Sequence, residues 1–335
     1  MDEPSSPHRL TWLAQTKFHP PRLRGDVISR SRLLGDLHDA LTSHALTLIS
    51  APAGYGKTTL LAEWVHTTSK LQTPNSKVQT PNSQAVDVGD LKFEVGSLDF
   101  SGVAWLSLDE DDNDPARFLA ALIVALQRLN PACGTTAQTL LTSLPNPGAE
   151  ARRLMGVLIN SLLETLPDPF ILILDDLHLI VEPPIYGALD YLLERLPPQM
   201  RLVVAARHDP PLSLARLRAR GDLVELRLPD LRFTDEEASQ FLNGKLRLGL
   251  SPADLTTLQA RAEGWPAGLR LLAGSLDRID SAAERSAFIH HQADADRYVF
   301  GYMAEEVLKR QEPEMRTFLL ETSILAELAP ALCQA

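Results

Sequence analysis

The sequence predicts an α/β fold with a parallel sheet, followed by an all-α region, and three observations carry this prediction. Short apolar runs that suit buried strands alternate with amphipathic helical stretches as far as residue 228. Beyond that residue the strand pattern stops and helix-start signals recur. The composition agrees with packed domains, because 44% of the 335 residues are apolar.

The charge and the cysteine content narrow the class of protein. The formal net charge of −11 argues against a surface built to neutralise nucleic-acid phosphates. Cys133 and Cys333 have no metal-type spacing, so we expect reduced thiols. The polar start and the lack of a long apolar run predict no secretory signal and no membrane contact, and therefore a cytoplasmic protein.

Five short apolar runs are expected to form the sheet. Continuous apolar runs of this length suit strands that are covered on both faces, and the fifth run alternates between apolar and charged residues. The expected strands are residues 45–50, 103–108, 170–174, 201–206 and 223–228. Helices are expected from about Lys57, over 118–126, over 154–166 and over 188–196.

Residues 51–59 (APAGYGKTT) carry the strongest functional signal. They match the P-loop pattern GxxxxGK[ST] at Gly56, Lys57 and Thr58, with Ala51 in place of the first glycine. Lys57 is expected to reach the β- and γ-phosphates of ATP, and Thr58 to ligate Mg²⁺. A chance glycine-rich turn is the alternative, but this segment lies between a strand and a helix, as the motif requires. The predicted nucleotide contacts are Ala53, Gly54, Tyr55, Gly56, Lys57, Thr58 and Thr59.

Two carboxylates follow the third apolar run, as in a Walker B strand. Asp175 is predicted to hold Mg²⁺, and Asp176 to orient or deprotonate the attacking water. The alternative is a strand that ends in solvated acids. Arg207 ends the fourth run, where ligands bind parallel sheets, and is predicted to contact the γ-phosphate. Its alternative role is an ion pair with Asp209.

Other segments carry weaker signals. QTPNS occurs at 72–76 and again at 79–83, and we expect a disordered insertion over residues 67–98. The basic segment 17–32 is interpreted as a solvated face rather than a nucleotide contact. Thr234 with Glu237, and Ser251 with Pro252, predict helix starts. By spacing alone, residues 263–268 (EGWPAG) are an ordinary turn between helices.

Several segments together resemble the MalT-like, LuxR-type ATP-dependent transcriptional regulators, which are STAND-class P-loop ATPases. They are KFHPPRLRGDVISRSRLL, LISAPAGYGKTTLLAEW, VAWLSLDEDDNDPARFLAAL, LILDDLH, LRFTDEEASQFL and EGWPAGL. The resemblance implies a P-loop NTPase with a parallel sheet, then an all-α helical subdomain and the start of a winged-helix domain. The expected boundaries are 1–45 for an N-terminal segment of the adenine pocket, 46–228, 229–295 and 296–335.

The same resemblance implies further site residues. Val27 and Ile28 would line the adenine pocket, and Pro266, in a GxP motif with Gly264, would pack on the adenine. Arg207 would be the sensor arginine. The catalytic set is then Lys57, Asp176 and Arg207.

The resemblance also implies a nucleotide switch. ATP would favour a self-associating state, and slow hydrolysis to ADP would reset it. An inducer, small molecule or protein, and DNA would be contacted only through C-terminal domains that this sequence lacks, so we expect a fragment or a truncated product. Two alternatives stay open: a dedicated P-loop ATPase such as a motor or loader, and a scaffold that binds nucleotide for stability.

Overall fold

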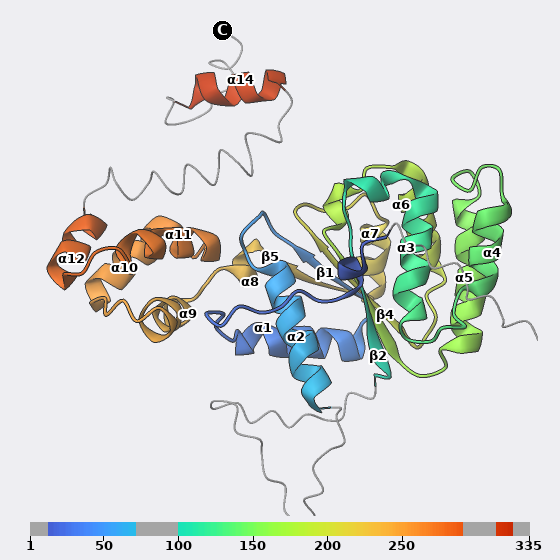
Figure 1. Cartoon of the computed structure of the whole chain (residues 1–335), viewed down its shortest axis with the longest axis horizontal. Helices are drawn as coiled ribbons and strands as arrows, with labels where there is room; N and C mark the ends of the chain where they lie inside the picture. Colours follow the sequence, from blue (N-terminus) through green and yellow to red (C-terminus); the bar gives the residue numbers. More distant parts are fainter. Residues whose placement is uncertain (1–12, 72–99, 291–312, 324–335) are drawn as a thin grey trace, which may run out of the picture. The chain divides into compact units, whose positions relative to one another are not determined.

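The computed structural model describes residues 13–71, 100–290 and 313–323 (Figure 1). The chain divides into two compact units, Met1–Leu231 and Arg232–Ala335. The sequence predicted a domain boundary at residue 228, and the structure divides the chain after Leu231.

A five-stranded parallel sheet lies at the centre of the first unit. The strands follow the order β2-β3-β4-β1-β5, so β1 lies between β4 and β5. Within this order Leu48 of β1 pairs with Val204 of β4 and with Glu225 of β5. The five predicted strands are confirmed. Their bounds are β1 Leu46–Ser50, β2 Gly102–Ser107, β3 Phe170–Asp175, β4 Met200–Ala206 and β5 Leu223–Arg227.

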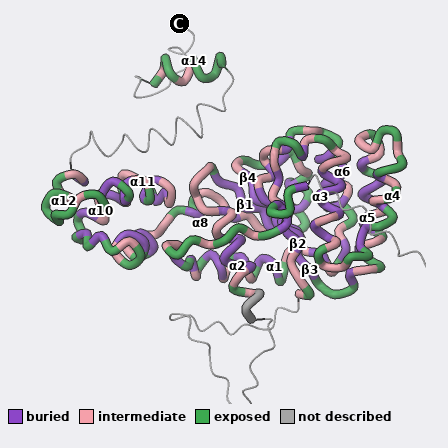
Figure 2. The backbone as a smooth tube through the Cα atoms, viewed as in Figure 1, coloured by how far each residue is buried: buried purple, intermediate pink, exposed green. Residues whose placement is uncertain are grey.

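Helices cover both faces of this sheet (Figure 1). On β3, Leu172 and Leu174 pack in one core, whereas Ile171 and Ile173 pack in the core on the opposite face. Both faces are buried along β1, β3 and β4, which explains why these strands are mainly apolar, whereas the edge strand β5 is mostly half-buried and carries Glu225 and Arg227 (Figure 2). The first core receives α3 Pro115–Gln127, α4 Thr135–Ser143, α5 Ala151–Thr165, α6 Pro183–Glu194 and α7 Leu214–Arg220. The second receives α1 Ser31–Ser43, α2 Lys57–Leu71 and Leu231 of α8 Leu228–Leu231.

Some of these helices differ from the prediction. The helix α1 was not predicted, although Leu33, Leu37 and Leu41 are buried at helical spacing. The helix α6 begins at Pro183 rather than near Ala188, because proline is favoured in the first turn, where it loses no hydrogen bond.

The start of the predicted insertion is helical. The helix α2 continues through Leu71, past the predicted start at Thr67. The hydroxyl groups of Thr67 and Thr68 donate to the carbonyl groups of Glu63 and Trp64 at 2.9 and 2.8 Å. The helix α2 therefore extends further than composition indicated. Both QTPNS repeats lie outside the described residues.

Helices make up the described part of the second unit. Thr234 and Glu237 form the predicted capping box, and Ser251 forms another with Asp254. The helix that begins after Thr234 was expected to run through Leu242, but it becomes π-helical from Gln240. The elements are α9 Asp235–Ser239, π-helical Gln240–Lys245, α10 Pro252–Ala262, α11 Pro266–Leu276, α12 Ala282–His290 and α14 Pro313–Thr322. A further predicted helix, 303–308, lies outside the described residues.

Candidate nucleotide-binding site

The loop between β1 and α2 has the backbone that the P-loop pattern predicts. Gly54 and Gly56 have φ angles of 81° and 79°, in the left-handed region that favours glycine. The helix α2 then begins at Lys57, so its unpaired N–H groups lie at the end of the loop. This combination can bind a phosphate group through backbone donors and the helix dipole.

The Lys57 side chain folds back on this loop. It is only 7% exposed, and Nζ donates to the carbonyl groups of Ala51 at 2.6 Å and Pro52 at 3.1 Å. Burial lowers the pKa of Lys57, the negative charge of Asp176 opposes this, and the positive charge of Arg207 lowers the pKa further. Lys57 and both predicted catalytic partners therefore interact electrostatically.

Asp175 and Thr58 lie together, although 117 positions separate them in the sequence. The Thr58 hydroxyl donates to Asp175 Oδ1 at 3.0 Å, and Asp175 is 1% exposed at the end of β3. Burial, together with the charge of Asp176, raises the pKa of Asp175 to about 7. A carboxylate and a hydroxyl beside a phosphate-binding loop are the oxygen ligands that suit Mg²⁺. The two residues therefore fit the predicted metal role.

Asp176 and Arg207 follow neighbouring strands. Asp176 comes directly after β3 with a φ of 61°, and its side chain is 41% exposed. Arg207 comes directly after β4, which pairs with β3. Asp209, the alternative partner considered for Arg207, binds Arg227 at 2.9 Å and lies 3.6 Å from Arg218. The carboxyl ends of three adjacent strands thus bring all the predicted catalytic residues to one sheet edge.

The other predicted nucleotide contacts of the first unit lie along residues 53–59 and in the segment before α1. Ile28 is 4% exposed, and Val27 is half-buried in a turn where its N–H donates to the Arg24 carbonyl at 3.2 Å. Ala53 and Thr59 are half-buried, and Tyr55 packs against the core formed with α1 and α2. Their roles at a nucleotide stay predictions.

The basic segment 17–32 is not simply a solvated face. Lys17 is 8% exposed and binds Asp109 at 2.9 Å as well as the fully buried Asp112. Arg30 is also buried. The acidic run after β2 has a structural use, because Asp109 and Asp112 form the capping box of the 3₁₀ helix Glu110–Asn113. The D-x-x-D spacing in the sequence was the signal that could have shown it.

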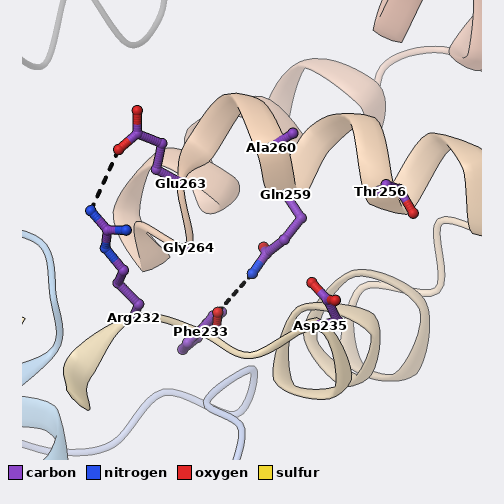
Figure 3. Close-up of a pocket in the computed structure, with 8 residues that line it drawn as sticks. All are labelled: Arg232, Phe233, Asp235, Thr256, Gln259, Ala260, Glu263 and Gly264. Carbon is purple, nitrogen blue, oxygen red and sulfur yellow. Dashed lines mark hydrogen bonds and ion pairs between the residues drawn. The ribbon is translucent and has the colours of Figure 1, made fainter. Parts of the chain in front are cut away.

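The turn before α11 in the second unit borders a pocket of about 350 Å³ (Figure 3). Gly264 has a φ of 70°, and its carbonyl accepts from the Phe233 N–H at 2.8 Å. Gln259 donates to the Phe233 carbonyl at 2.6 Å, and Arg232 lies 3.5 Å from Glu263. Pro266 occupies the first turn of α11, as predicted for a helix start. The pocket lining includes Gly264 but none of the predicted nucleotide contacts.

Comparison with known proteins identifies the relatives of this chain. It is 34% identical over 313 residues to the HTH-type transcriptional regulator MalT of Yersinia enterocolitica, covering 93% of this chain and 30% of that protein. The MalT proteins of Serratia proteamaculans and Cronobacter sakazakii are 33% and 32% identical over the same shares. Residues 304–335 match the MalT winged helix domain family. The chain is a homologue of the N-terminal part of MalT-type transcriptional regulators.

This MalT-type homologue spans about a third of the length of the relatives that it matches, 30% of each. The resemblance seen in the sequence, the α/β fold with a parallel sheet and the MalT winged-helix segment are therefore confirmed. Of that segment, the structure describes 313–323, where α14 lies.

Two solved structures also align with most of the chain. The Aeropyrum pernix ORC1 protein in complex with DNA aligns with 90% of this chain and 73% of its own, at 16% identity and a TM-score of 0.45. A RuvB variant of Thermotoga maritima covers 85% and 78%, at 17% identity and a TM-score of 0.40. Within residues 13–71, 100–290 and 313–323, no helix has the length and apolar character needed to cross a membrane.

Proposed function

We propose that the first unit binds ATP or ADP with Mg²⁺ and acts as a slow ATPase switch in a transcriptional regulator. The observation that carries this proposal is the meeting of Thr58 and Asp175 at 3.0 Å, beside a buried Lys57 at the start of α2. A scaffold that bound nucleotide only for stability would not need a Mg²⁺-type pair and a second carboxylate at the same edge.

Each residue has a distinct role in the proposed site. The N–H groups of residues 53–59 bind phosphate oxygens, and Lys57 leaves the Ala51 and Pro52 carbonyls to bind the β- and γ-phosphates. Thr58 and Asp175 hold Mg²⁺, which when bound neutralises charge on the phosphates. Asp176 orients the attacking water, and Arg207 senses the γ-phosphate. Val27, Ile28 and Pro266 are proposed to contact the adenine.

A switch needs different affinities of the nucleotide for two conformations. We propose that ATP favours a self-associating state and that hydrolysis to ADP restores the resting state. Contacts with an inducer and with DNA would belong to the parts of the MalT relatives that this chain does not match. The proposed domains are 46–228 for the P-loop domain, 229–295 for the helical domain and 296–335 for the winged-helix segment.

The nucleotide content of the purified chain, followed by its ATP turnover rate, tests this proposal. We expect retained ADP and turnover far below the typical 1–100 s⁻¹ of kinases.

Lys57→Ala should abolish nucleotide binding, because the phosphates lose their buried cation. Asp176→Ala should keep binding and lower turnover by about 10²-fold or more, the usual effect of losing a general base. Unchanged affinity in Lys57→Ala would refute the P-loop assignment, and brisk wild-type turnover would favour a dedicated ATPase.

A further inference from the structure

Two large aliphatic side chains are exposed in the described part of the first unit. Val181, between β3 and α6, is 72% exposed, and Leu163, near the end of α5, is 49% exposed. A single exposed aliphatic residue needs no explanation. These two, however, lie beside charged groups of opposite sign, which suggests how both could be covered.

Val181 lies beside the acidic turn that follows β2. Asn113 of this turn connects the two, because its amide nitrogen donates to the Leu179 carbonyl at 2.8 Å and its Oδ1 accepts from the Val181 N–H at 2.7 Å. These two hydrogen bonds fix the exposed valine at the edge of the acidic turn.

The acidic turn carries more negative charge than its cations neutralise. Residues 109–112 and 114 are five carboxylic acids. The buried Lys17 binds two of them, and Arg117 lies 2.9 Å from Asp111. Two cations thus oppose five carboxylates. The exposed members of this group, together with the valine, form what we call the acidic patch: Glu110, Asp111, Asp114 and Val181.

Leu163 lies at the end of the α5–α6 pair that carries Arg195. The two helices run in the same direction, because they precede the adjacent parallel strands β3 and β4. The Gln199 amide donates to the carbonyl groups of Leu162 and Leu166 at 3.5 and 3.0 Å. Since Gln199 lies four positions after Arg195, the C-terminal ends of α5 and α6 lie together.

Two exposed arginines stack on Tyr191 of α6. The guanidinium carbon of Arg195 lies 4.1 Å from the ring centroid, and that of Arg152 on α5 lies 5.1 Å from it. Stacking on an aromatic ring holds a guanidinium group in place, while its N–H groups can still bind an anion. Glu194 does not neutralise this group, because Arg195 and Arg216 share it at 3.0 and 3.2 Å. We call Arg152, Leu163, Tyr191 and Arg195 the basic patch.

The two patches lie at opposite ends of α6. Val181 lies two residues before this helix begins, and Arg195 directly follows its end. A helix of 12 residues is about 18 Å long, so one copy cannot bring its own two patches together. On two copies, the acidic patch of one can meet the basic patch of the next in a head-to-tail contact.

We propose that the acidic patch of one copy docks on the basic patch of a second copy of this chain. Val181 and Leu163 then cover each other at the centre, and arginines meet carboxylates around them, which is the usual arrangement of an apolar core and a polar rim. This inference names the surfaces of the self-association in the proposed function and rests on it. Because the contact joins two different surfaces, it can continue to a third copy.

The test uses the full chain and reverses one charge on each patch. Arg195→Glu alters the basic patch, and Glu110→Arg alters the acidic patch. Sedimentation velocity with Mg·ATP and with Mg·ADP would measure the self-association of each variant alone and of their equimolar mixture. Arg24→Glu and Asp39→Arg are matched controls, because both residues are exposed and α1, which carries Asp39, packs on the opposite face of the sheet from α5 and α6.

We expect each reversal to weaken self-association by about tenfold or more, because like charges then face each other. The equimolar mixture should recover most of the wild-type association, since each copy then offers the surface that its neighbour needs. The controls should associate like wild type, and every variant should keep its nucleotide affinity and melting temperature. Wild-type association in both reversals, or a mixture no better than either variant alone, would overturn the inference.

Leu163→Ser and Val181→Ser test the apolar part of the contact, and they replace a charge reversal that fails to fold. Each removes an aliphatic side chain from the proposed contact and should weaken self-association about fivefold or more. Unchanged association in both serine variants would refute the contact.

These outcomes separate the inference from the proposed function. A wild type that stays monomeric with either nucleotide would refute both the inference and the proposed self-association, while bound ADP would keep the nucleotide site. A wild type that self-associates regardless of changes in either patch would refute the inference alone.

Discussion

Burial makes the charge of Asp175 costly in the absence of a cation. The carboxyl group is 1% exposed, and its pKa is raised to about 7 from 3.8 by burial and by Asp176. The sequence motif predicted the position of Asp175 after an apolar strand. It could not predict the pKa, which depends on the tertiary burial of the carboxyl group and on the neighbouring Asp176, Thr58 and Lys57. The same limit applies to Lys57, whose contacts with Ala51 and Pro52 follow from the loop conformation.

Asp175→Asn should stabilise the protein at high pH when Mg²⁺ and nucleotide are absent. The raised pKa means that the native state keeps a proton which the unfolded state loses, so wild-type stability falls as pH rises from about 4 to about 7. The asparagine side chain stays neutral at every pH. At pH 8 the free energy of unfolding of the variant protein should therefore exceed that of wild type by roughly 2–4 kcal/mol. Urea unfolding at several pH values would measure the difference, which should vanish near pH 4. The exposed Asp39→Asn is the control, and a gain independent of pH would contradict this explanation.

Gly264→Ala should destabilise the second unit. A Cβ at this position would lie 2.9 Å from the Phe233 carbonyl oxygen and 3.0 Å from the Arg232 Cβ, and the φ of 70° disfavours alanine. We expect a loss of about 1–3 kcal/mol in thermal or urea unfolding. Gly274→Ala in α11 meets no atom within 4 Å and serves as the control, with a change near zero or a small gain. Equal stability of the two variants would show that the turn before α11 can relax.

At the scale of elements, a buried ion pair attaches the N-terminal segment to the acidic turn after β2, within the first unit. The 3₁₀ helix η1 (Gln15–Phe18) carries Lys17 to the acidic turn after β2, where Asp112 is fully buried. Composition suggested a solvated basic face because local sequence gives no information about a partner more than ninety positions away. The strands and the P-loop were predictable because their signals are local, in apolar runs and in the spacing of glycine and lysine. By contrast, α1 was missed because its leucines follow a basic, proline-containing stretch.

Lys17→Met should destabilise the first unit by about 2–4 kcal/mol. Methionine keeps the apolar stem but removes the Lys17 cation from the buried Asp112 carboxylate, and Arg117 Nε lies 3.9 Å from that carboxylate. Chemical unfolding would measure the loss, and Arg24→Met, at an exposed position of the same segment, should change stability by less than about 0.5 kcal/mol. Asp112→Asn in the Lys17→Met background should recover part of the loss. No recovery would mean that Lys17 contributes by packing rather than by charge.

At the scale of the whole molecule, the proposed site gathers groups from segments far apart in the chain. Residues of α2, β3 and the end of β4 must all be folded before Lys57, Thr58, Asp175 and Arg207 can meet. A ligand that binds this arrangement and not the unfolded chain must raise the stability of the first unit. The motifs predicted which residues meet, and the sheet order β2-β3-β4-β1-β5 supplies the reason that they can.

Mg·ADP should therefore raise the melting temperature of the first unit. At a free concentration of about 100 times its Kd, the ligand adds about 2.7 kcal/mol, which corresponds to roughly 5–10 °C for a domain of this size. Differential scanning calorimetry with and without Mg·ADP would measure the shift, and would also show whether the two compact units melt in separate transitions. Lys57→Ala should show no shift at the same concentration, because its site lacks the lysine cation that binds the phosphates. The control variant His66→Phe, on α2, should keep the full shift. A wild-type melting temperature that does not depend on Mg·ADP would mean that the P-loop geometry of this chain does not bind nucleotide.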